Sequence, residues 1–174
     1  PLIIMAPKSL LRHPKVISDI TELADGNFHE VLGDSLDSEN TDRILLCSGK
    51  IYYELIAHRE TSGHTNAALI RIEQLCPFPY SALASCLEKY TTRNITWVQE
   101  EPRNCGGWIY MREAFSRYFP QINLKYFGRD ETASNATGSF KHYQEEQKKL
   151  VKLAFASAQN QAAVNGQTNR GDMK

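Results

Sequence analysis

Four short polar segments hold the side chains that could do chemistry, and each directly follows an apolar run: Ser48–Lys50, Arg71–Gln74, Gln99–Glu101 and Gly128–Arg129. A Ser-Gly pair at the start of a helix can offer backbone N–H groups to an anion, and Lys50 would add a positive charge. Adjacent carboxylates such as Glu100 and Glu101 can serve as acid and base, because like charges push their pKa values apart.

A structural interpretation competes with each of these chemical ones, and we favour it. Ser48 and Gly49 are also an ordinary way to begin a helix, since the spacing of a full phosphate-binding loop is missing. Arg71 lies on an otherwise apolar strand where an unpaired charge is costly, so we expect it to bridge to Glu100 or Glu101 on the next strand. The sequence places no histidine or nucleophile beside these two glutamates. We therefore identify no catalytic residue.

The elements that must position these segments alternate between strand-like and helix-like patterns. We expect strands at 44–47, 67–72, 95–98 and 124–127, and helices at 51–59, 81–90, 108–118 and 142–157. This alternation predicts βαβ units and a mostly parallel sheet in one α/β domain. The carboxyl ends of parallel strands meet at one edge, where open α/β folds bind ligands and partners. The polar segments should converge there.

The segment from Ile95 to Trp108 forms the clearest part of this edge. We expect Pro102 to end its strand, because proline cannot continue a central strand. Asn104 should cap the next helix, and Gly106 with Gly107 should turn the backbone toward it. The polar residues of the edge would then form a structural rim that consists of Glu73, Gln99, Glu100, Glu101, Asn104 and Arg129.

The two ends of the chain give weaker patterns. Residues 2–5 are typical of a short strand, and 16–24 of a short helix that stops at Asp25. The acidic stretch 33–42 indicates a solvated surface loop, to which we assign no function. Residues 1–157 should form the domain, and the polar residues 158–174 a flexible tail.

Composition argues against several classes of protein. Twenty basic residues balance twenty acidic ones, whereas nucleic-acid binders usually carry a basic excess. No apolar run approaches the roughly 18 residues of a membrane-spanning helix. The four cysteines and five histidines lack the spacing of metal sites or disulfide frameworks. Cys47 suits a buried strand end, and Cys105, at the polar turn, is the candidate for a reactive thiol.

Four separated motifs occur in order along the chain: Pro7–Pro14, Cys47–Tyr53, Arg71–Pro79 and Trp97–Pro102, the last followed by Asn104 and Gly106. Together they resemble the C-terminal domain of the thiamine-diphosphate-dependent decarboxylating subunit of 2-oxoglutarate dehydrogenase, over roughly residues 1–157. Several motifs in order are a far stronger signal than one. The 2-oxoadipate enzyme shares much of the pattern, but the variants at 10–14 and 73–75 resemble the oxoglutarate family.

The resemblance implies a fold like the C-terminal domain of transketolase, a three-layer α/β sandwich with a mostly parallel sheet of about five strands. It also implies a full subunit that decarboxylates 2-oxoglutarate and passes the succinyl group to the lipoyl arm of a partner acyltransferase. In that family thiamine diphosphate and Mg²⁺ belong to the preceding catalytic domains. A homodimer in the bacterial cytoplasm or the mitochondrial matrix is implied as well.

Some relatives carry an acetyl-CoA regulatory site on this domain, built largely from basic residues. Arg12, Lys50 and Arg71 match basic positions of the family, and with Ser48 they form the acyl-CoA or anion site that the resemblance implies. The pattern departs at residues 80–82, where those relatives carry arginines that can grip phosphate and this chain has Tyr-Ser-Ala.

Two alternatives from other classes stay open. The chain could be a free-standing α/β module that binds CoA or a nucleotide at the edge formed by Ser48 and Lys50. It could also be a dimerisation domain, with Phe78, Tyr80 and Trp108 in the contact, because projecting aromatic residues are typical of interfaces.

Overall fold

Five strands form one sheet in the order β1-β3-β2-β4-β5 within the part of the chain that is described. They are β1 (Val31–Leu32), β2 (Arg43–Cys47), β3 (Ala67–Ile72), β4 (Ile95–Pro102) and β5 (Lys125–Arg129). β1 pairs with β3 in antiparallel fashion, and the other pairs are parallel. The structure is a computed structural model, and it describes residues 1–36, 38–134 and 138–156.

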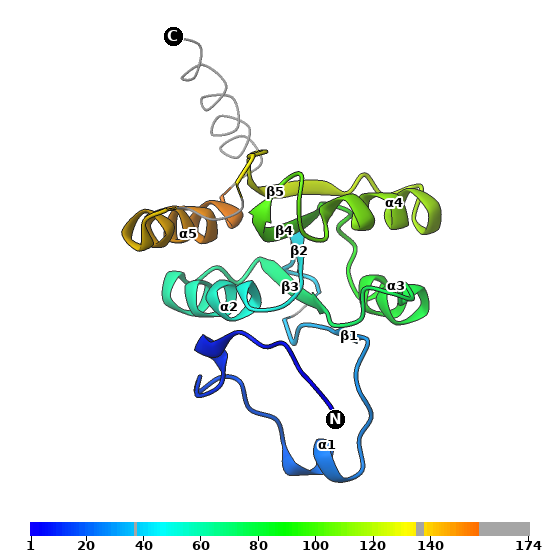
Figure 1. Ribbon diagram of the computed structural model, residues 1–174. Helices are drawn as coiled ribbons and strands as arrows, with labels where there is room; N and C mark the ends of the chain where they lie inside the picture. The colour runs from blue at the N-terminus through cyan, green and yellow to red at the C-terminus, as the bar shows by residue number, and fades with distance from the viewer. Residues whose placement is uncertain (37, 135–137, 157–174) are drawn as a thin grey trace.

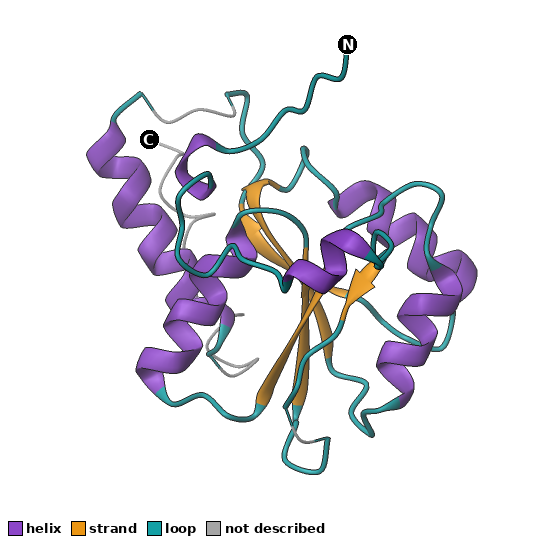
Figure 2. Ribbon diagram, turned by 90° about the horizontal axis from the view of Figure 1, so that it is seen from below, coloured by secondary structure: helices purple, strands orange, loops and turns teal. Residues whose placement is uncertain are grey.

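Helices cover both faces of this sheet, which gives three layers. Helices α2 (Ile51–Ser62) and α5 (Phe140–Ala154) lie on one face, and α3 (Tyr80–Glu88) and α4 (Trp108–Tyr118) lie on the other (Figure 1 and Figure 2). The mostly parallel three-layer architecture expected from the sequence is confirmed. The helix expected at 142–157 begins two residues earlier, and position 157 lies outside the described residues, as does the segment 158–174.

The sheet separates two apolar cores. Alternate residues of β2 point to opposite faces. Ile44 and Leu46 belong to the core beneath α3 and α4, whereas Leu45 and Cys47 belong to the core beneath α2 and α5. Because both faces are covered, a central strand can be apolar without interruption. Burial raises the pKa of the Cys47 thiol to about 12, as expected for a thiol that fills space in the core.

The first thirty residues, here called the N-terminal arm, differ from expectation. Residues 2–5 form no strand. The edge of β3 is paired instead with β1, a strand of two residues that is too short to show a periodic pattern in the sequence. A 3₁₀ turn, η1 (Lys8–Leu10), precedes helix α1 (Ile20–Ala24). This helix starts later than expected because Asp19 caps it, and it stops before Asp25 as predicted.

The prediction that Pro102 ends its strand is wrong, because β4 runs through Pro102. The register of β4 against β5 shifts between Val98 and Pro102, where Pro102 comes opposite Arg129. A bulge of this kind leaves an extra residue out of the ladder, so the missing N–H of proline does not break a regular row of hydrogen bonds.

The acidic stretch 33–42 is more than a solvated loop. The side chain of Asp34 is only 5% exposed and forms an ion pair with Arg59 of α2. It also accepts a hydrogen bond from the backbone N–H of Leu69 in β3, at 2.6 Å. The loop therefore ties α2 to the sheet through one buried carboxylate.

Asp34→Ala should lower the free energy of unfolding by about 2–4 kcal/mol, because it leaves the Arg59 guanidinium and the Leu69 N–H without their partner. Urea denaturation followed by circular dichroism measures the change. Asp130→Ala, which removes an exposed carboxylate, should stay within about 0.5 kcal/mol of the original protein. Equal midpoints for the two variants would contradict this role of Asp34.

Candidate functional site

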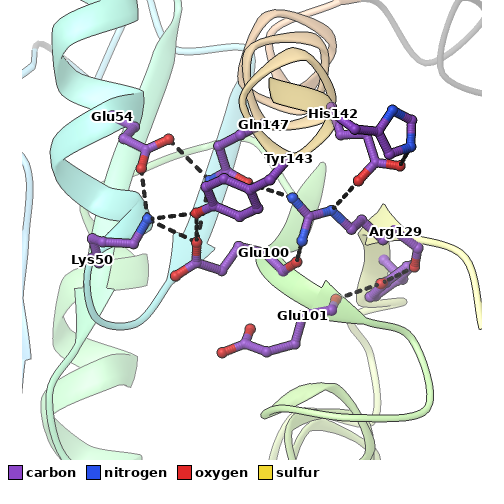
Figure 3. Close-up of polar contacts among 10 residues, drawn as sticks. Lys50, Glu54, Glu100, Glu101, Arg129, His142, Tyr143 and Gln147 are labelled. Carbon is purple, nitrogen blue, oxygen red and sulfur yellow. Dashed lines mark hydrogen bonds and ion pairs between the residues drawn. The ribbon is translucent and has the colours of Figure 1, made fainter. Parts of the chain in front are cut away.

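The turn between β2 and α2 brings Ser48, Gly49 and Lys50 to the carboxyl edge of the sheet. Gly49 has a φ of 72°, a left-handed conformation that favours glycine. Lys50 is the residue that precedes the first turn of α2. Its position sends the lysine side chain away from the turn and toward β4 and α5 (Figure 3).

The ammonium group of Lys50 is held by three partners from three different elements. It lies 2.9 Å from Glu54 Oε1 on α2, 2.9 Å from Glu100 Oε2 on β4 and 3.0 Å from the Tyr143 hydroxyl on α5. The Lys50 and Glu100 side chains are 20% and 22% exposed. An ammonium has three N–H donors, so all three are used within the chain.

A second layer of contacts links α5 to the sheet around this lysine. The Gln147 side-chain amide donates to Glu54 Oε2 at 2.9 Å, and its oxygen accepts from Arg129 Nη2 at 3.1 Å. Arg129 also donates to the backbone oxygen of Glu100 at 3.0 Å and lies 3.5 Å from Glu146. Figure 3 shows the whole set converging between α2, β4 and α5.

The pKa of Lys50 is raised above its ordinary value of 10.5. Burial acts in the opposite direction, since it disfavours the charged form. The hydrogen bonds with Tyr143, Glu54 and Glu100, together with the negative charge of Glu100, outweigh burial. The lysine is therefore firmly protonated at neutral pH and is a poor candidate for a general base.

Gln99 organises the other side of the edge. Its side-chain oxygen accepts from the Trp97 indole at 2.8 Å and from the Trp108 backbone N–H at 2.9 Å. Its amide group donates to the backbone oxygens of Pro102 and Cys105, at 3.1 and 2.8 Å. The residue is 3% exposed. One buried amide thus fixes the turn from β4 into α4.

Arg71 does not bridge to Glu100 or Glu101, and that prediction is wrong. The strand order explains why, because β2 lies between β3, which carries Arg71, and β4. Arg71 instead pairs with Glu73 at 2.6 Å, donates to the Tyr53 hydroxyl at 2.8 Å and lies over the Tyr52 ring at 4.4 Å. Both neighbouring tyrosines come from α2, so Arg71 fastens that helix to β3.

Two further expectations fail at the turn after β4. Asn104 is not a helix cap, since α4 begins after Gly107. The Asn104 side chain bonds instead to both the N–H and the C=O of Thr132, which joins the turn to the segment after β5. Trp108 cannot form a subunit contact, because only 4% of it is exposed.

A cavity of about 510 Å³ opens at this edge. Ser48, Gly49 and Lys50 line it on one side, and Gln99, Glu100 and Glu101 on the other. Of the four residues of the expected anion site, Ser48 and Lys50 line this cavity, whereas Arg12 and Arg71 do not. Two carboxylates face one lysine there, a charge balance that disfavours a phosphate as long as Lys50 keeps its present partners.

Glu54, Tyr143 and Gln147 are the members of this site that sequence reasoning missed. A signal existed for one of the contacts, since Lys50 and Glu54 are four residues apart. Tyr143 and Gln147 have the same spacing. Residues four apart share one face of a helix. The sequence offered no comparable sign that the faces of α2 and α5 meet.

The described residues contain no group of three or more His, Cys, Asp or Glu side chains that could hold a metal ion. In the same part of the chain, none of the helices has the length and apolar character that crossing a bilayer requires. Cys105 is half-buried beside the cavity, whereas Cys76 is exposed and lines it. The reactivity of Cys105 stays a prediction.

Comparison with known proteins agrees with the sequence motifs. A model of the family described as 2-oxoglutarate dehydrogenase C-terminal matches residues 17–155. The chain belongs to this family. The 2-oxoglutarate dehydrogenase E1 component of Azotobacter vinelandii is 43% identical over 162 residues, and that of Haemophilus influenzae is 42% identical over 160 residues. The expected family is therefore confirmed.

This member of the 2-oxoglutarate dehydrogenase C-terminal family spans only 17% of the length of these two relatives, although the matches cover 89% and 90% of the chain itself. Among solved structures, a split-gene transketolase described as an inactive beta4 tetramer matches with a TM-score of 0.56. That match has 14% identity and covers 85% of this chain and 46% of the other. At such identity the likeness shows the fold, and it confirms the transketolase-like architecture.

Gln99→Ala should lower the free energy of unfolding by about 2–4 kcal/mol, because it leaves buried donors and acceptors on both sides of the turn without their hydrogen-bond partner. Urea denaturation measures this loss, and near-ultraviolet circular dichroism should report movement of Trp97 and Trp108. Gln121→Ala, at an exposed position, is the matched control and should change little. A Gln99→Ala protein as stable as the control would show that the amide network is dispensable.

Lys50→Ala should destabilise the protein by about 1–3 kcal/mol at pH 7, since two partly buried carboxylates lose their common cation. A group whose pKa is raised on folding contributes its full stabilisation of the folded state at pH values below its pKa in the unfolded chain, and this contribution declines at higher pH. The stability difference between the two proteins should therefore be constant from pH 7 to pH 10 and shrink above pH 10.5.

Melting temperatures of the original protein, Lys50→Ala and the surface control Lys148→Ala, measured across this pH range, provide the test. A difference that had already vanished at pH 9, or that matched the Lys148→Ala control at every pH, would contradict the proposed arrangement.

Proposed function

We propose that this chain is the C-terminal domain of the decarboxylating subunit of a 2-oxoglutarate dehydrogenase, and that its carboxyl edge braces the subunit instead of carrying out chemistry. The observation that carries the proposal is the closed network around Lys50. Its three partners, Glu54, Glu100 and Tyr143, use up every donor of the ammonium. A catalytic acid, base or nucleophile needs to be within reach of substrate, and these groups reach one another.

The full subunit would decarboxylate 2-oxoglutarate and pass a succinyl group to the lipoyl arm of its acyltransferase partner. Thiamine diphosphate supplies the carbanion-stabilising chemistry in such enzymes. Among the described residues, no group of three or more His, Cys, Asp or Glu side chains offers a site for its Mg²⁺. We infer that the preceding domains hold both, and we derive no reaction step from this chain.

The partners of the subunit follow from the same proposal. They are the chain's own preceding domains, a second subunit in a homodimer and the lipoyl acyltransferase, in the bacterial cytoplasm or the mitochondrial matrix. Tyr80 and Tyr118, which are 45% and 39% exposed, are available for contact on the face of α3 and α4. Trp108 takes no part in that surface.

An acyl-CoA or anion site at Ser48 and Lys50 stays a prediction. The cavity of about 510 Å³ gives it room. An incoming phosphate would have to compete with Glu54 and Glu100 for the lysine, and neither Arg12 nor Arg71 lines the cavity to assist. The free-standing CoA or nucleotide module is therefore the weaker alternative.

The experiment is a graft into the Azotobacter vinelandii E1 component, in which this chain replaces the 162-residue segment that it matches. We expect the chimaera to release CO₂ from 2-oxoglutarate in the presence of thiamine diphosphate and Mg²⁺. The E1 component without any C-terminal segment should be inactive, and so should this chain alone.

The controls separate bracing from catalysis. Lys50→Ala in the chimaera should lower its thermal stability while leaving kcat, measured well below the melting transition, within about two-fold of the unmodified graft. Turnover by this chain alone, or complete loss of kcat in a folded Lys50→Ala chimaera, would overturn the proposal.

A further inference from the structure

Three aromatic rings meet where the C-terminal ends of α2 and α5 come together. His58 lies on α2, His64 on the turn that follows it, and Phe155 directly after α5. The ring centroids are 5.4 Å apart for His58 and Phe155, 5.2 Å for His64 and Phe155, and 5.9 Å for the two histidines. These three residues, here called the histidine cluster, join the two helices on one face of the sheet (Figure 1).

Phe155 is the buried member of the histidine cluster. Only 4% of it is exposed, and it belongs to the apolar core beneath α2 and α5. Its ring is nearly parallel to that of His64, at 13°, and inclined to that of His58 by 49°. A neutral imidazole packs against a phenyl ring as one aromatic surface against another. The cluster therefore closes the core at the end of α5 while both histidines are uncharged.

Positive charges surround the histidine cluster. On α5, the charge of Lys152 acts on His58. From β2, Arg43 donates to two backbone oxygens that directly follow α5, at 3.1 and 2.6 Å. The carboxylate partner of Arg43 is Asp42, at 2.9 Å. A proton that binds to the cluster therefore adds one more cation to this region.

No carboxylate offsets a charge on the two imidazole rings. Among the described residues, neither histidine of the cluster forms an ion pair, in contrast to His142, which pairs with Glu146 at 3.0 Å. Glu54 lies one helical turn before His58, but both of its oxygens are bound within the network around Lys50. An imidazolium in the cluster would have like charges as its neighbours.

Burial lowers the pKa of His58 below its ordinary value of 6.5, and the positive charges of His64 and Lys152 lower it further. One imidazolium gains attraction from the face of a phenyl ring, but a second one beside it adds a like charge at 5.9 Å. A group whose pKa is lowered on folding binds its proton more readily once the structure opens. The contribution of His58 to stability is therefore complete above pH 6.5 and is lost as the pH falls below this value.

We propose that the histidine cluster is a pH-sensitive contact: acid protonates His58 beside His64, and the C-terminal end of α5 then separates from α2. The opening is local. At the other end of α5, Tyr143 is bound to Lys50, and protonation of His142 places a cation beside a glutamate. Acid thus loosens one end of the helix and strengthens the other. This inference does not depend on the function proposed above.

Hydrogen exchange of this chain tests the proposal. The protection factors of the amides at residues 150–154 should fall about ten-fold between about pH 7.5 and pH 5.5, because the end of α5 opens locally. Those at residues 44–47, in the central strand β2, should change by less than about two-fold. Constant protection at residues 150–154 would overturn the proposal. An equal fall in β2 would do so as well, since it indicates unfolding of the whole domain.

A ring that cannot be protonated shows whether the cluster is responsible. His58→Phe keeps an aromatic ring beside Phe155 and removes the titrating group, so protection at residues 150–154 should stay within about two-fold over the same pH range. His142→Phe is the matched control on α5, and it should retain the fall in protection. The same pH response in both variants contradicts the role of His58.

A second pair of variants covers the case in which a phenyl ring packs poorly at position 58. Lys152→Gln removes a positive charge that acts on His58. The proton then binds at a smaller cost, and the fall in protection should shrink to about three-fold. Lys149→Gln, at an exposed position of the same helix, should leave the fall unchanged. A fall of equal size in these two variants counts against the proposal.

Discussion

The partly buried ammonium of Lys50 is the constraint around which this domain is arranged. A cation removed from water needs nearby negative charge, and two carboxylates from different elements provide it. Satisfying Lys50 fixes the distance between α2 and β4, and the hydroxyl of Tyr143 then draws in α5. One layer of the sandwich is thus aligned with the sheet by polar contacts at its rim, in addition to the apolar packing beneath.

Gln99 performs the corresponding task on the opposite face. Its amide satisfies the Trp97 indole, the first turn of α4 and two carbonyls of the intervening turn at the same time. Glu100 follows it directly and points to the other face, toward Lys50 (Figure 3). Two consecutive residues of β4 therefore connect both helical layers to one strand, which is possible because successive side chains of a strand alternate in direction.

The sequence predicted the central strands, their parallel arrangement and the convergence of polar residues on one edge, because these follow from local periodicity. It failed where a contact depended on strand order. The predicted bridge from Arg71 to Glu100 or Glu101 would join β3 to β4, and these strands are not neighbours in the sheet. The sequence predicts a solvated loop around Asp34, because nothing in the neighbouring polar residues indicates its ion pair with the distant Arg59. The sequence gives no sign of the contact between Lys50 and Tyr143. Helix periodicity indicates which face of a helix is apolar, but it does not indicate which polar groups on other elements its side chains will contact.

The partners of Lys50 are also widely spaced along the chain. Glu54 is one helical turn away, but Tyr143 is ninety-three residues further on. During synthesis on a ribosome, α2 emerges long before α5. In that interval α5 does not yet cover its face of the sheet, and Lys50 lacks its hydrogen-bond partner Tyr143. A domain whose last helix completes the packing exposes apolar surface until that helix has been synthesised. Co-translational handling by chaperones would matter most in this window, and it ends only when α5 arrives.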